Sequence, residues 1–440
     1  MAGRSRALWM AGAFLTFVSG AHAAPDTLSV ADCVRLAREH APTLAAARYA
    51  ERAAAAESTA TSLNRRPDVF LSAGALFAPE WSYDPAITNL GEYHLQTGLT
   101  WPLADGGHRT RERERAQIES ASARDRRRLE SRDAGERAAV LAYELLRLDD
   151  ASEVLRNANT GLGRLVPLVR AGVRAGARSP ADSMRLTLAL ANAELDLEDL
   201  RTERKAAAAE LLELIGRGAG SEPVVRAAPA DSDRAPTTAD SIALLSGLAR
   251  LPELALARAE EASARLDSAE TRHRGAPVVT LTLDAGLLGS DLTRAVPASL
   301  LADDPDAVFA DRLRRDLGAS AAFDFRLPLL DRALAPSLAA RTESMHAAAA
   351  SSTAEGARQR REALDGLERW RTAAARVRAT VDIVTGAEMH VLRLKSLYAA
   401  GATTLFELLD AVELDRFARL RLGEALETLR IERFRIEDRR

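Results

Sequence analysis

Four short segments of the chain alternate apolar residues with polar or small ones. The third segment is the most regular, with Val279, Leu281 and Leu283 on one side of the alternation and Thr280 and Thr282 on the other. A period of two with one apolar face predicts half-buried strands. In each half of the chain two such strands follow one another, so the pattern predicts two strand hairpins. The four segments are residues 69–77, 93–103, 278–287 and 319–327.

Between these strands the apolar positions change to a 4-3 spacing, which is typical of coiled-coil helices. It is clearest at Leu141, Leu145, Leu148 and Leu155, and it resumes after a turn near residue 179. We expect residues 106–174 to form one helix despite Pro167, with a length of roughly 100 Å. The other predicted helices cover residues 30–64 with a kink at Pro42, 180–214, 240–274, 332–398 and 404–437.

The chain is internally duplicated, because landmarks of the first half recur in the same order in the second. Residues 40–44 match 250–254, residues 66–69 match 276–279, residues 101–105 match 327–331, and residues 175–182 match 400–407. An internal repeat of this kind defines the architecture. We therefore predict a first structural repeat over 24–216 (helix, β-hairpin, long helix, return helix), a linker over 217–238 and a second repeat over 239–440.

The beginning of the chain has the pattern of an export signal. Arg4 and Arg6 precede an apolar run over 7–18, and small residues at Ala21 and Ala23 suit a cleavage site, so residues 1–23 are predicted to be a signal peptide. The only cysteine, Cys33, follows Asp32 well beyond that site. We interpret it as an ordinary helix residue that is not lipidated.

Net charge and composition narrow the class of protein. The formal net charge is −3, and it becomes more negative when the leader is removed, which argues against a nucleic-acid partner. The seven histidines are scattered without metal-ligand spacing, and residues 216–220 lack the Lys-Ser/Thr of a phosphate-binding loop. We expect no catalytic activity, no metal and no cofactor.

The four strands need partners from other chains. A barrel needs about eight strands to close, and open strand edges are not tolerated in lipid. Three copies supply twelve strands, an even number within the usual range. We therefore expect a homotrimer, although four copies would also close.

Three stretches carry a resemblance to a known family: residues 28–44, residues 101–107, and the two turns at 174–182 and 398–407. Together they resemble the TolC-like outer-membrane efflux protein family. The resemblance implies a mainly α fold with a membrane β-barrel portion, in which a trimeric twelve-stranded barrel in outer-membrane lipid is continued by a periplasmic α-helical barrel. It also implies a passive exit duct for small molecules or proteins in a tripartite efflux or type I secretion system. The implied partners are a periplasmic adaptor (membrane fusion protein) and an inner-membrane pump or ABC exporter. The alternative is a periplasmic coiled-coil scaffold or adaptor without a pore.

The two turns contain the candidate functional residues. Gly176 and Gly401 suit a helix end with positive φ, and Ser179 with Asp182 and Thr404 with Glu407 have capping-box spacing. The resemblance implies that Glu407 and Asp410 line a lumenal constriction, to which we add Asp182; the other interpretation is that these carboxylates only cap helices.

Part of the family has a basic residue at the position of Thr403, where it holds the gate shut. Here Arg178 occupies the matching site of the first half, while Tyr398 matches the family. The resemblance therefore implies that, if a contact holds this gate shut, it involves other residues than in that part of the family.

The strand-to-helix junctions are the remaining candidate sites: Trp101, Pro102, Asp105, Pro328 and Asp331. We expect Asp105 and Asp331 to be N-caps of the long helices. Trp101, with Phe323 and Phe325, is either part of an interfacial aromatic girdle or an ordinary lipid-facing residue.

Overall fold

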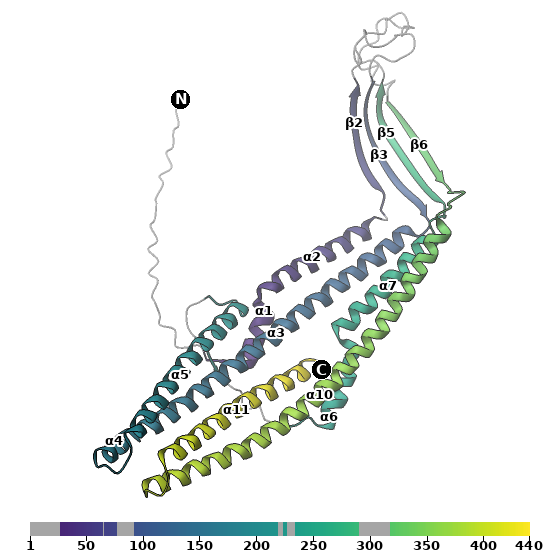
Figure 1. Ribbon diagram of the computed structural model, residues 1–440. Coiled ribbons are helices and arrows are strands. Elements are labelled where there is room, and N and C mark those ends of the chain that lie inside the picture. Colours follow the sequence, from purple (N-terminus) through teal and green to yellow (C-terminus); the bar gives the residue numbers. More distant parts are fainter. Residues whose placement is uncertain (1–26, 65, 77–91, 219–222, 227–233, 290–316) are drawn as a thin grey trace, which may run out of the picture.

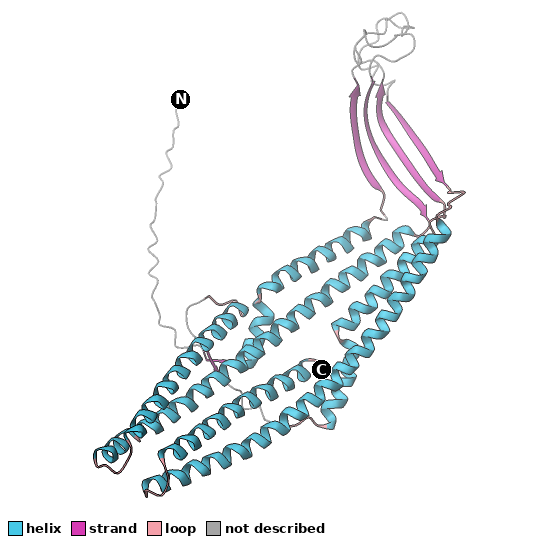
Figure 2. Ribbon diagram, in the orientation of Figure 1, coloured by secondary structure: helices cyan, strands magenta, loops and turns pink. Residues whose placement is uncertain are grey.

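The computed structural model describes residues 27–64, 66–76, 92–218, 223–226, 234–289 and 317–440. The molecule is a long helical body with a four-stranded sheet at one end (Figures 1 and 2). The predicted leader over 1–23 and half of the predicted linker lie outside the described residues.

Two long helices run through most of the helical body, and shorter helices pack along them (Figure 1). In the first half, α1, α2 and α5 pack on α3; in the second half, α7 and α11 pack on α10. Because α3 also contacts α7 and α11, it joins the two halves. The bounds are α1 Val30–His40, α2 Pro42–Leu63, α3 His108–Gly163, α5 Pro180–Leu214, α7 Pro252–Arg272, α10 Leu334–Ala399 and α11 Leu405–Asp438.

Short elements lie where the two halves meet. Strand β1 (Thr27–Ser29) pairs in parallel with β4 (Val224–Arg226), so the beginning of the described chain is tied to the segment between the halves. Helix α6 (Thr238–Gly247) and the 3-10 turn η2 (Leu248–Arg250) lead into α7. The sequence pattern did not predict the β1–β4 pair, because three residues are too few to show a period.

Prolines divide the predicted helices more sharply than expected. The prediction of one helix over 106–174 is wrong, because α3 ends at Gly163 and α4 (Val166–Arg174) begins two residues beyond Arg164. Pro167 lacks an N–H, and in a continuous helix its ring would collide with the carbonyl of Gly163. The kink expected at Pro42 is likewise a full break between α1 and α2. By contrast, α10 is continuous over 66 residues.

The predicted strands are confirmed and form one antiparallel sheet in the order β2-β3-β5-β6. Register places Leu99 opposite Val69 and Leu283, and Leu283 opposite Ala321. Because directly opposed residues point to the same side of a sheet, the apolar positions of all four strands lie on one face. The strands are β2 Asp68–Leu76, β3 Glu92–Asp105, β5 Val278–Gly289 and β6 Leu317–Arg326.

The opposite face of the sheet carries hydrogen-bonded polar side chains, with Phe70 as a large apolar residue among them. Ser320 donates its hydroxyl hydrogen to the Asp284 carboxylate at 3.0 and 2.8 Å, and the Ser72 hydroxyl lies 3.1 Å from His94 Nε2. Threonines at Thr280 and Thr282 belong to the same face by alternation. Within the described residues, β2 and β6 each have one edge without a neighbouring strand.

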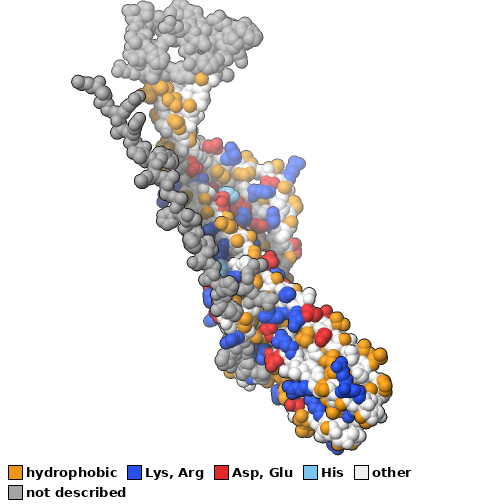
Figure 3. Space-filling model, turned by 90° about the vertical axis from the view of Figure 1, so that its left-hand side faces the viewer, with side chains coloured by type: hydrophobic (Ala, Val, Ile, Leu, Met, Phe, Trp, Pro, Cys, Tyr) orange, Lys and Arg blue, Asp and Glu red, His pale blue; other side chains and the backbone are white. Residues whose placement is uncertain are grey.

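Buried side chains form clusters along the helical body. One joins α1, α3 and α5 around Leu145, Leu148 and Leu211, and it includes Cys33, whose thiol pKa is raised to about 11 by burial. Another surrounds Trp370 in the second half. On the face in Figure 3, acidic and basic side chains are interspersed over the helical body, and hydrophobic side chains show both on the sheet and at the far end of the helical body.

Candidate gate at the helical turns

The chain reverses direction at two turns at the end of the molecule opposite the sheet (Figure 1). Gly176 has φ of 71° and Gly401 has φ of 77°, which confirms the predicted left-handed positions. In each turn the residue after the glycine donates its N–H back to the helix, Ala177 to the Gly172 carbonyl and Ala402 to the Leu397 carbonyl, both at 2.9 Å. Both helices therefore end in the same Schellman motif.

The two return helices begin differently. At α11 the predicted capping box is confirmed: the Glu407 N–H donates to the Thr404 hydroxyl at 3.2 Å, and the Thr404 N–H donates to the Glu407 carboxylate at 3.0 Å. The Thr403 hydroxyl also donates to this carboxylate and is the main reason that the pKa of Glu407 is lowered. The carboxylate of Glu407 is thus fixed by hydrogen bonds from residues at the start of α11.

At α5 the predicted capping box is wrong. The Ser179 hydroxyl accepts from the N–H of Ala181 at 3.2 Å instead of from that of Asp182. The N–H of Asp182 donates to the Ser179 carbonyl at 3.0 Å instead. Asp182 remains in the first turn of the helix, where a carboxylate is favoured by the helix dipole.

The two turns are joined by Arg178 and Tyr398. The guanidinium carbon of Arg178 lies 3.8 Å from the centroid of the Tyr398 ring, and Arg178 Nη2 donates to the Tyr398 carbonyl at 3.4 Å. Sequence reasoning named both residues but did not predict their contact. The contact is one of the links between the first and second hairpins near the tip.

Tyr398 is nearly inaccessible to solvent, with 1% of its surface exposed. It packs with Leu186 of α5 and with Leu405 and Leu408 of α11. Burial raises the pKa of its phenol, Arg178 opposes this shift and Asp182 adds to it. The structure therefore brings Asp182, Arg178 and Tyr398 together.

Glu407 and Asp410 lie apart from that contact, exposed on the surface of the single chain. They are three residues apart near the start of α11, so they share one side of this helix. Asp410 is outside the capping box. Both carboxylates are thus open to solvent in the single chain.

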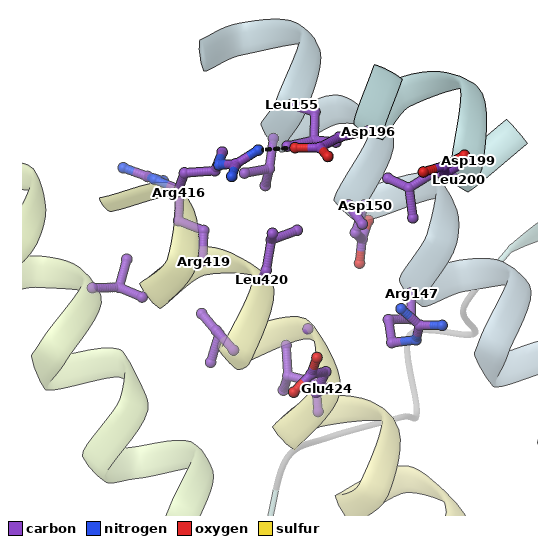
Figure 4. A pocket seen from close by; sticks show the side chains of 16 residues that line it. Arg147, Asp150, Leu155, Asp196, Asp199, Leu200, Arg416, Arg419, Leu420 and Glu424 are labelled. Atoms are coloured by element: carbon purple, nitrogen blue, oxygen red, sulfur yellow. Dashed lines mark hydrogen bonds and ion pairs between the residues drawn. The ribbon is translucent and has the colours of Figure 1, made fainter. Parts of the chain in front are cut away.

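Above the turns, a groove of about 500 Å³ separates the two hairpins (Figure 4). Arg416 of α11 pairs with Asp196 of α5 across it. Asp150 of α3 also lines the groove, and burial raises the pKa of its carboxyl group. Sequence reasoning missed this site, because Arg416 and Asp196 are 220 residues apart and no local pattern connects them.

At the strand-to-helix junctions, both predicted caps are displaced. The N-cap of α3 is Gly107, whose left-handed backbone starts the helix two residues after Asp105; the Asp105 carboxylate accepts from the N–H groups of Gly107 at 2.9 Å and Arg109 at 3.1 Å. The N-cap of α10 is Ala333, whose N–H donates to Asp331 at 2.9 Å. Asp105 and Asp331 stabilise these helix starts from outside the cap position.

The three other predicted junction residues are separated in space. Trp101 is 43% exposed on the apolar face of the sheet, and Pro102 borders an irregularity in the pairing of β3 with β5. Pro328 lies in the segment that connects β6 to α10.

Residues 33–217 match the family model of outer membrane efflux proteins. The match covers less than half of the chain, and over that segment the chain is similar to this family. Among solved structures, the chain is similar to VceC from Vibrio cholerae, with 18% identity, a TM-score of 0.75 and coverage of 92% of this chain and 95% of VceC. It is similar to CusC, with 14% identity, a TM-score of 0.78 and coverage of 92% and 91%. It is also similar to the open state of MtrE from Neisseria gonorrhoeae, with 15% identity, a TM-score of 0.71 and coverage of 92% and 88%.

These likenesses extend over both halves of the chain and concern its fold. No protein of the curated collection matches the sequence. Within the described ranges, no three His, Cys, Asp or Glu residues are grouped as metal ligands would be. Over the same ranges, none of the helices combines the length and the apolar character needed to cross a bilayer.

Proposed function

We propose that this chain forms the outer-membrane exit duct of a tripartite efflux or type I secretion system. The observation that carries the proposal is the sheet, which has an apolar face continuous over four strands and a hydrogen-bonded polar face behind it. Its strands contain 9 to 14 residues. Tilted strands of about 9–11 residues are long enough to cross the hydrocarbon core. The apolar face would then contact outer-membrane lipid, and the polar face would line a water-filled barrel.

The free edges of β2 and β6 support a homotrimer. Pairing β6 of one copy with β2 of the next satisfies backbone groups that lipid cannot satisfy. Three copies give twelve strands, and their helical bodies would continue the barrel as a periplasmic tube. Such a duct conducts passively, moving small molecules or proteins that other components deliver.

The gate of this duct is proposed to lie at the paired turns. In the trimer, the carboxylates of Glu407, Asp410 and Asp182 would occur three times each around the narrow end, where rings of carboxylates attract cations. The contact of Arg178 with Tyr398 would hold the two hairpins of each copy together while the gate is closed. Both features concern the same end of the molecule, opposite the sheet.

Asp410→Asn tests the acidic constriction, because Asp410 is exposed and caps nothing. In planar-bilayer recordings, cation selectivity and block by multivalent cations should fall. Glu368→Gln is the matched control, since Glu368 is an exposed carboxylate of α10 paired with Arg371 one turn along the same helix. If Asp410→Asn behaved like this control, the constriction would have to lie elsewhere.

The groove between the hairpins supports the proposed partners. Its lining combines apolar residues such as Leu155 and Leu420 with charged residues of α3, α5 and α11, which suits the helices of a periplasmic adaptor. The adaptor would link the duct to an inner-membrane pump or ABC exporter. No nucleic acid is involved, and Cys33 carries no lipid in this proposal.

Membrane fractionation tests the proposed function. The protein should appear in the outer-membrane fraction, require detergent for extraction and have the mass of three chains by native mass spectrometry. Recovery from the periplasm without detergent, as a monomer, would instead favour a coiled-coil scaffold or adaptor without a pore.

A further inference from the structure

A pocket of about 390 Å³ lies at mid-height of the helical body, where the two halves meet. Seven arginines contribute to its lining, together with a single acidic residue, Asp438. The arginines come from four separate segments: α1, α3, η2 and the residues after α11. Because like charges repel one another, the gathering of these arginines around one pocket requires an explanation.

Ion pairs explain part of this convergence. Arg132 of α3 bonds to Glu253 of α7, with one N–H···O distance of 3.2 Å, and Arg440 lies 2.7 Å from Asp240. The acidic partners Glu253 and Asp240 are outside the pocket lining. A guanidinium group has five N–H donors, so each of these pairs leaves further N–H groups that could bond a ligand.

Arg38 is held by a different arrangement. It pairs with Asp438, and its guanidinium lies against Gly135 of α3, where a Cβ atom would come within 2.5 Å of Arg38 Nε. The Nε atom is buried and has no hydrogen-bond partner in the described structure. The absence of a side chain at Gly135 thus makes room for the guanidinium group of Arg38, whose Nε–H group is not used in a hydrogen bond.

Two arginines of the lining are not needed to join the halves. Arg128 bonds only locally, to Asp125 at 2.9 Å, and its side chain is 66% exposed. Arg250 is exposed in η2, and no ion pair of the described structure includes it. Ion pairs that served only to join the halves would not be strengthened by these two additional cations at the same pocket.

We propose that this pocket binds a phosphate-bearing oxyanion. Guanidinium groups match the oxygens of phosphate with two parallel hydrogen bonds, and charge-assisted bonds of this kind are about twice as strong as neutral ones. The pocket is larger than one orthophosphate ion, so a diphosphate or a phosphate ester fits better. The bound anion would link α1 and α3 of the first half to η2 of the second. The proposal does not depend on the transport function.

Calorimetric titration of the purified full-length protein tests this site. Inorganic phosphate, pyrophosphate and citrate are titrated at matched ionic strength. Pyrophosphate should bind saturably and more tightly than phosphate, and it should raise the thermal midpoint. Absence of saturable pyrophosphate binding would overturn the proposal, and citrate binding as tightly as pyrophosphate would overturn the assignment to phosphate chemistry.

Paired variants separate the pocket from general surface charge. Arg128→Ala with Arg250→Ala should weaken pyrophosphate binding tenfold or more and leave the thermal midpoint without ligand unchanged. Arg201→Ala with Arg265→Ala is the control, because these exposed arginines make the same kind of local pair on other helices. Equal weakening in both double variants would show that binding reflects net charge alone and would refute the site.

Discussion

At the scale of single residues, the contact of Arg178 with the Tyr398 ring has the clearest predicted consequence. A cation over a desolvated aromatic ring contributes about 2 kcal/mol. Arg178→Ala should therefore loosen the joint between the two hairpins and raise the conductance of the channel in planar bilayers. Arg174→Ala, an exposed arginine of the same turn, should leave conductance unchanged. Identical conductance in the two variants would contradict a role for Arg178 in closing the tip.

Asp240 gives a prediction for pH dependence. The Arg234 guanidinium at 2.5 Å and the N–H and hydroxyl of Thr237 hold the pKa of this carboxyl well below its usual range. Because the folded pKa is depressed, the stabilisation is complete above about pH 4 and is lost as the pH falls below it.

The free energy of unfolding should therefore be higher for the wild type than for Asp240→Asn near pH 7, and the difference should narrow as the pH approaches 3. Denaturant unfolding followed by tryptophan fluorescence can measure this, since Arg234 lies 5.2 Å from the Trp370 ring. A difference that did not change with pH would refute the assignment.

At the scale of elements, the sheet predicts opposite outcomes for neighbouring residues. Leu281 lies opposite Trp101 and Phe323 on the apolar face, whereas Thr280 points to the polar face. Leu281→Arg should reduce stability in the membrane by about 2–4 kcal/mol, and Thr280→Arg should be tolerated. The measurement is refolding into lipid vesicles at increasing denaturant. Equal losses in both variants would show that the apolar face does not contact lipid.

The sequence predicted those features that depend on local pattern. Strand alternation predicted the faces of the sheet, and glycine and hydroxyl residues predicted the turns at Gly401 and Thr404. It failed where two local preferences compete: leucine periodicity continues through Pro167, so the pattern favoured one helix although the backbone of Pro167 cannot continue it. Contacts such as Arg178 with Tyr398 could not be predicted, because they join residues 220 positions apart.

At the scale of the whole molecule, ion pairs between α3 and α11 hold the two halves together. Arg147 Nε lies 3.0 Å from the Glu427 carboxylate, both side chains are about one-fifth exposed, and burial raises the pKa of Glu427. Arg147→Met should lower the free energy of unfolding by about 1–3 kcal/mol, because Glu427 is left partly buried without its cation.

The double variant Arg147→Met with Glu427→Met should recover part of that loss, since it removes the unpaired charge. Arg201→Met, which removes an exposed local pair, is the control. Urea unfolding of the three variants measures the comparison. A double variant less stable than Arg147→Met alone would contradict this account of the interface.

The break between α3 and α4 makes the two halves mechanically unequal. A bending force on the tip of the first hairpin would meet this interruption at residues 164–165. The same force on the second hairpin would meet a continuous helix of 66 residues, which the segment 327–333 joins to β6. The first hairpin should therefore bend more easily near its tip than the second.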